Sequence, residues 1–222
     1  MTTTRGIDPT RRSTRRRRWP RAATVAACLV LVVASASCAV RDQAVPGPAT
    51  GAPLQPRIAA SDGFPAIPTA GMNPHQRALL ALLKTEYETQ PAGAAFAEGT
   101  REAWCADFVS WVYMKIGLPF DNPNSGSWRI PGVATLEDYF RGAGTFHSPG
   151  NGFTPKLGDV VMYDTTESRI WHQHTNIVLS VRDGQLTTIG GNQHGRITIT
   201  TYTLTDPRLG IRGFGRRIHN PA

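Results

Sequence analysis

Apolar residues recur every four positions between residues 102 and 117, which is the pattern of one buried face of a helix. The four positions of this stripe are Trp104, Phe108, Val112 and Ile116. Gly117 follows them and is typical of a helix end. A helix here places Cys105 in its first turn, where the partial positive charge of a helix N-terminus favours thiolate over thiol. Cys105 is therefore a candidate nucleophile. The alternative is a structural cysteine in the core, because free cysteine is among the most buried residue types.

Two further helices are predicted. Asn73 can cap the first, Pro74 suits its first position, and a group of leucines supplies an apolar face before Pro91 ends it. The second is a short helix over residues 133–141. From Gly158 onward the pattern changes to strands, predicted at 159–163, 174–181, 185–189, 196–202 and 210–216, with a two-residue turn at Asp183-Gly184. Helices followed by an antiparallel meander predict an α+β domain, with N-terminal helices packed on an antiparallel β-sheet.

The N-terminal part of the chain has the composition of an export segment. Residues 1–21 contain eight arginines and one aspartate, and an uncharged run over residues 22–40 follows. We expect residues 1–40 to be an export signal, or a lipoprotein leader with Cys38 as the modified residue. A retained membrane anchor is the alternative, because the run is long enough to span a bilayer. Each possibility places the remaining chain outside the cytoplasmic membrane of a bacterium, with membrane contact only through this segment.

Residues 41–74 are rich in proline, alanine and glycine and are predicted to be a tether. The folded domain is then expected at residues 75–220. The net charge of +8 belongs almost entirely to residues 1–21, which carry +7 of it. A nucleic-acid partner would need basic charge on the domain itself, so we expect no nucleic-acid binding. The domain holds a single cysteine, Cys105, and so has no internal disulfide.

The predicted strand that begins at His174 offers a base for Cys105. Alternation along a strand puts His174 on one face with Asn176 and Val178, and this face is expected to receive the Cys105 helix. An imidazole there can take the thiol proton and later protonate a leaving amine. Gly190-Gly191-Asn192 follows the return strand, and the Asn192 amide is the candidate that orients the ring. The ordinary alternatives are a satisfied polar histidine and a simple Gly-Gly-Asn turn.

A zinc site is a separate possibility. His172 and His174 have the spacing of residues on one strand face, and His194 follows, which together give three possible zinc ligands. No cysteine or acidic ligand lies near them in the sequence.

Four motifs, in this order, resemble those of a CHAP domain, a cysteine, histidine-dependent amidohydrolase/peptidase. They are Trp104–Trp111, Pro155–Val161, His174–Val178 and Ile189–Asn192. The resemblance implies a papain-like α+β fold related to the NlpC-type cell-wall peptidases. It implies that Cys105 is the nucleophile, that His174 is the general base and that Asn192 is the polar residue after the next strand. Many members carry Glu two residues before this Asn, where this chain has Gly190.

The resemblance implies a cysteine hydrolase that cleaves amide bonds of peptidoglycan, either at the muramoyl-alanine amide or at a peptide bond in the stem or crossbridge, and the predicted leader independently implies export. The expected partner is peptidoglycan, the domain is expected to act as a monomer, and the cysteine mechanism needs no cofactor. The backbone N–H of Cys105 is expected to contribute to an oxyanion hole. Loss of the Glu at position 190 leaves a second function open, in which the domain binds cell wall or a partner protein without cleaving it.

Overall fold

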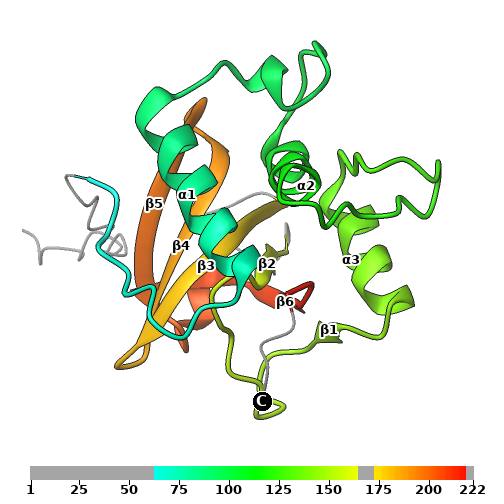
Figure 1. Ribbon diagram of the computed structural model, residues 1–222. Helices are drawn as coiled ribbons and strands as arrows, with labels where there is room; N and C mark the ends of the chain where they lie inside the picture. Colours follow the sequence, from blue (N-terminus) through cyan, green and yellow to red (C-terminus); the bar gives the residue numbers. More distant parts are fainter. Residues whose placement is uncertain (1–62, 165–172, 219–222) are drawn as a thin grey trace, which may run out of the picture. The chain divides into compact units, whose positions relative to one another are not determined.

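The computed structural model describes residues 63–164 and 173–218 (Figure 1). Within these ranges, three α-helices come first and six strands follow. The helices are α1 (Pro74–Thr89), α2 (Cys105–Lys115) and α3 (Val133–Gly142), with a short 3-10 helix at Gly93–Ala95. The strands are β1 (Phe146–His147), β2 (Val160–Tyr163), β3 (His174–Arg182), β4 (Gln185–Gln193), β5 (Arg196–Thr203) and β6 (Ile211–Gly215), with a second 3-10 helix at Pro207–Leu209. The predicted α+β class is confirmed.

Local sequence accounts for the helix ends. The Asn73 side chain accepts a hydrogen bond from the Gln76 backbone, and the Gln76 side chain accepts one from the Asn73 backbone, so α1 begins with a capping box. Pro74 occupies its first turn, as predicted. Helix α1 ends at Thr89, ahead of Pro91, and α2 begins at Cys105 itself. The leader predicted over residues 1–40 lies outside the described residues.

All six strands belong to one antiparallel sheet in the order β1-β6-β2-β3-β4-β5. Strands β2 to β5 form the predicted meander. Strand β6 departs from it, because it pairs with β2 and not with β5. The 3-10 helix at Pro207–Leu209 lies between β5 and β6 in the chain. Strand β4 also runs further than predicted, since it continues through Gly190 and Gly191 to Gln193.

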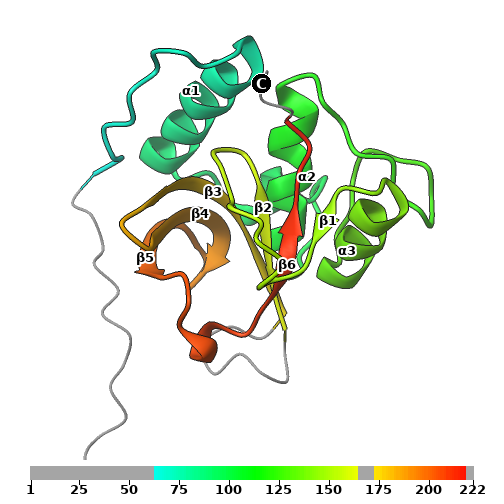
Figure 2. The same ribbon diagram turned by 90° about the horizontal axis from the view of Figure 1, so that it is seen from below.

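The sheet is buried on both faces. Helices α1 and α2 lie side by side over one face, and α3 lies beside β1 (Figure 2). Alternation along β2 divides its residues between two apolar clusters: Val160 and Met162 pack in the main core with α1 and α2, whereas Val161 and Tyr163 pack in a smaller cluster on the other face. Burying apolar surface on both faces favours one strand register over its alternatives, because a slip by one residue would exchange the two faces.

The prediction that the Cys105 helix packs on the strand face of His174, Asn176 and Val178 is wrong. Ile177 of β3 packs in the main core with α2, whereas Val178 packs in the smaller cluster. The face shared by His174, Asn176 and Val178 is thus the one turned away from α2. Sequence alternation identifies two faces of a strand, but it cannot tell which face a helix covers when both are buried.

Part of the range predicted as a tether lies on the domain. Phe64, Ile67 and Met72 pack against the main core, and the Phe64 ring meets the Tyr87 ring of α1 at 6.1 Å between centroids. Within the described ranges, none of the helices has the length and apolar character needed to cross a membrane.

Candidate active site

Cys105 is the first residue of α2, in a tightly packed part of the core. Trp104 stacks on Phe96 with 5.4 Å between centroids, and Gly93 and Gly191 leave room for the indole. The Cys105 side chain is buried, with 6% of the residue exposed. Burial raises the pKa of the Cys105 thiol, and the nearby Asp107 carboxylate adds to this, while backbone hydrogen bonds from Ala106 and Thr175 oppose it. The resting sulfur is therefore a thiol near neutral pH.

His174 is the first residue of β3 and is buried, with 5% of the residue exposed. Its ring lies 6.1 Å from the Tyr163 ring between centroids. Burial lowers the pKa of His174 to about 4, and a hydrogen bond with the Asn176 side chain opposes this change. The imidazole is neutral at pH 7, so it can accept a proton.

The three residues predicted for the site line one pocket. Cys105 comes from the start of α2, His174 from the start of β3, and Asn192 from the end of β4. The pocket has a volume of about 500 Å³, and the segment Pro131–Val133 forms another part of its wall. Residues far apart in the sequence thus meet where two strand ends and a helix N-terminus converge.

Two side chains that were not predicted for the site, Gln193 and Asn176, are hydrogen-bonded to the His174 ring. Gln193 Nε2 is 3.0 Å from His174 Nε2 and also donates to Asn176 Oδ1 at 3.1 Å. Asn176 Nδ2 in turn donates to Thr188 Oγ1 at 3.0 Å. The two-residue spacing from His174 placed Asn176 on the correct face, but nothing in the sequence singled out Gln193.

A β-bulge explains why Gln193, and not Asn192, reaches the ring. The register between β4 and β5 shifts between Gly190 and Gln193, and Asn192 has a left-handed backbone with φ of 61°. Within the described residues, the side chains of Gln193 and Asn176 are hydrogen-bonded to His174, and that of Asn192 is not. Asn192 stays a predicted site residue on the strength of its place in the pocket wall.

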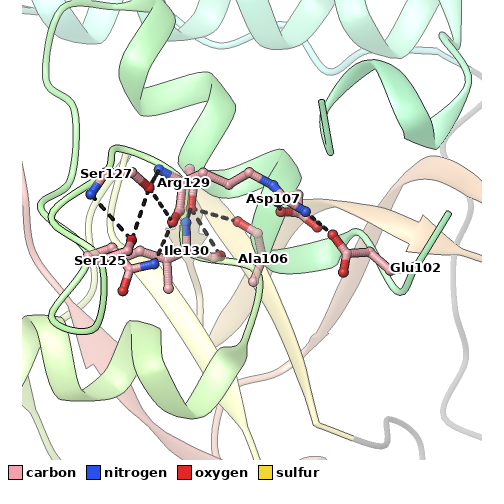
Figure 3. Close-up of polar contacts among 9 residues, drawn as sticks. Glu102, Ala106, Asp107, Ser125, Ser127, Arg129 and Ile130 are labelled. Carbon is pink, nitrogen blue, oxygen red and sulfur yellow. Dashed lines mark hydrogen bonds and ion pairs between the residues drawn. The ribbon is translucent and has the colours of Figure 1, made fainter. Parts of the chain in front are cut away.

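Polar contacts fasten one pocket wall to the helix that carries Cys105 (Figure 3). Arg129 Nε donates to Asp107 Oδ1 at 2.7 Å, and the guanidinium also pairs with Glu102. Ser110 Oγ donates to Ala106 O at 2.9 Å and accepts from Ile130 N at 3.1 Å. The wall segment Pro131–Val133 follows directly in the chain, so these bonds fix its position relative to α2.

The zinc alternative depends on His172, which lies outside the described residues. His174 and His194 both line the pocket. Over residues 63–164 and 173–218, no group of three or more His, Cys, Asp or Glu side chains is placed to hold a metal ion.

The arrangement defines an α+β domain with a thiol and a neutral imidazole in one pocket. Residues 97–192 match the family model described as CHAP domain. The resemblance to a CHAP domain is thus confirmed over this range, which lies within the wider domain predicted from the sequence.

Two solved structures are also similar to this chain. One is a crystal structure of Ly7917, with 16% identity and a TM-score of 0.43, covering 64% of this chain and 62% of that one. The other is Ly7917 with the hydrolyzing product of MDP, with 17% identity and a TM-score of 0.41, covering 63% of this chain and 61% of that one. The chain thus spans less than two thirds of either. No curated protein matches the sequence.

Proposed function

We propose that this protein is an exported cysteine hydrolase that cleaves amide bonds of peptidoglycan. The observation that carries the proposal is the pocket of the CHAP domain, which is lined by Cys105 at the start of α2 and His174 at the start of β3.

The proposed reaction begins with a neutral pair. His174 takes the Cys105 thiol proton as the sulfur attacks the carbonyl carbon of the amide. The carbonyl π electrons move to oxygen, and we assign the backbone N–H of Cys105, at the helix N-terminus, as a donor to that oxyanion. The C–N bond then breaks, His174 gives its proton to the leaving amine, and a thioester remains on Cys105.

Water completes the cycle. His174 takes a proton from water as the water oxygen attacks the thioester carbonyl. The C–S bond breaks, the carboxylic product leaves, and the proton returns to the Cys105 sulfur. No cofactor takes part. Asn192 lies in the wall of the pocket, where it can contact substrate. An enzyme with this substrate acts outside the cytoplasmic membrane, which agrees with the export signal predicted over residues 1–40.

The test is mass spectrometry of the soluble fragments that the full chain and Cys105→Ala release from purified peptidoglycan. We expect fragments only from the native protein, and their masses identify the bond that is cut. Wall binding with no fragments from either protein would support the non-catalytic function instead. Release that stops with a chelator and resumes with zinc would support the metal site.

A further inference from the structure

We propose that Gln193 and Asn176 are the positioning residues of His174, and that together they select the ring tautomer that can act as base. The inference rests on the proposed function, because it assigns roles within the same site. It moves the orienting role from Asn192 to a pair of buried amides that were not singled out for it from the sequence.

The two buried amides form a hydrogen-bonded group that contacts Nε2 of the His174 ring through Gln193. Gln193 and Asn176 are 2% and 0% exposed, so neither amide exchanges its partner for bulk water. Gln193 Nε2 lies 3.0 Å from His174 Nε2 and 3.1 Å from Asn176 Oδ1. Gln193 thus contacts Nε2 of the ring, and our proposal assigns Nδ1 to the thiol of Cys105, which lines the same pocket as His174.

A second layer of neutral groups holds the pair. Asn176 Nδ2 donates to Thr188 Oγ1 at 3.0 Å and to Tyr202 OH at 3.4 Å. Tyr202 OH is also hydrogen-bonded to Tyr163 OH in the smaller cluster. Buried polar groups that are hydrogen-bonded to one another specify a single arrangement, because a change would leave some of them unpaired.

The amides can set the tautomer because each can turn by 180° about its last bond. When both are turned, Gln193 Oε1 accepts the Nε2–H of His174, and Asn176 Nδ2 donates to the same oxygen. The hydroxyl groups of Thr188 and Tyr202 then donate to Asn176 Oδ1. In the orientation described, Gln193 Oε1 is buried with no hydrogen-bond partner among the described residues, so turning it breaks no bond at that atom. In this arrangement the proton of the neutral imidazole is on Nε2, and Nδ1 carries the lone pair that accepts the thiol proton in the proposed reaction.

Gly190 provides the space for this arrangement. It pairs with Thr198 in the sheet, and a Cβ added to it would lie 2.6 Å from Asn176 Cγ and overlap Asn176 Oδ1. The Asn176 amide therefore occupies the place of a side chain at position 190.

The test is ¹⁵N NMR of the imidazole of His174 in the full-length protein, assigned with His174→Gln. We expect the Nε2–H tautomer in the native protein. Gln193→Met fills the same volume without an amide, and we expect it to give a mixed tautomer and to lower fragment release by about tenfold or more. Gln193→Glu can only accept at this position, and we expect it to keep the Nε2–H tautomer and much of the activity.

Gln185→Met is the matched control, because Gln185 lies on the same strand and is exposed. If Gln193→Met does not fold, Gln193→Asn, which keeps the amide but shortens the side chain, serves in its place. The same tautomer and a release rate within twofold of native in the folded Gln193 variant would overturn the positioning role. If the native protein releases no fragments, the proposed function fails, and the tautomer measurement still decides the inference.

Discussion

Gly190 and Asn176 face each other across neighbouring strands β4 and β3, and the Asn176 amide fills the space in front of the Gly190 backbone. The backbone of Gly190 is not left-handed, so its requirement for glycine comes from this close approach alone. The contact connects the β4 strand to the histidine of the pocket, because the same Asn176 side chain hydrogen-bonds His174.

Gly190→Ala should therefore displace Asn176 and disturb His174. We expect it to reduce fragment release strongly and to lower the free energy of unfolding by about 1–3 kcal/mol through overpacking. Gly190→Ala/Asn176→Ala should regain stability without regaining activity. Gly142→Ala is the control, because a Cβ there meets nothing within 4 Å. Native activity in Gly190→Ala would contradict this interpretation.

Removing only one partner of the buried ion pair between Arg129 and Asp107 should be strongly destabilising. Asp107 is 0% exposed, so Arg129→Met leaves a buried carboxylate without its guanidinium. We expect the free energy of unfolding in denaturant to fall by about 3 kcal/mol, and Arg129→Met/Asp107→Asn to recover most of this. Arg208→Met, which removes an exposed pair with Asp206, should change little. Equal losses in Arg129→Met and Arg208→Met would show that the buried pair has no special role.

Burial of neutral His174 should make the fold sensitive to acid. The pKa of His174 is about 4 in the folded chain against an ordinary value of 6.5. The unfolded chain therefore binds this proton first as the pH falls, and stability drops from about pH 6.5 down to about pH 4. The loss is on the order of 3 kcal/mol. Denaturant unfolding at several pH values should show a smaller drop for His174→Gln, and parallel curves for the two proteins would refute the neutral buried state.

Alkylation of Cys105 should report a thiol and not a preformed thiolate. Burial raises its pKa above that of an ordinary cysteine, so the rate of labelling by iodoacetamide should still be rising above pH 8.5. The labelled Cys105 peptide is quantified by mass spectrometry, which separates it from Cys28 and Cys38. A rate that is already constant below pH 7 would instead indicate a stable thiolate–imidazolium pair.

Much of the fold could be predicted because local patterns determine it. The apolar stripe from Trp104 to Ile116 gave α2, and the Asn73-Pro74 pair gave the start of α1. Each of these patterns lies within one short segment of the chain, so the segment's own residues are enough to predict the helix. The position of β6 beside β2 was not predicted, because the residues of two distant strands do not indicate that these strands pair with each other.

The site was predicted only in part for the same reason. Residue type and order indicated Cys105 and His174, and both line the pocket. The contact between Gln193 and His174 could not be predicted from the sequence, because a bulge between Gly190 and Gln193 changes which side chain points at the histidine. Prediction from a strand pattern assumes that successive side chains alternate between the two faces of the sheet. A bulge interrupts this alternation at the end of β4, next to the pocket.

The most direct test of the central claim is the rate of fragment release by Cys105→Ala relative to the native protein, after circular dichroism has shown that both are folded. We predict a rate lower by about 10³-fold or more, because the nucleophile and its base act as a unit. Cys28→Ala, which removes a cysteine outside the domain, should keep the native rate. Release by Cys105→Ala within tenfold of native would contradict the account.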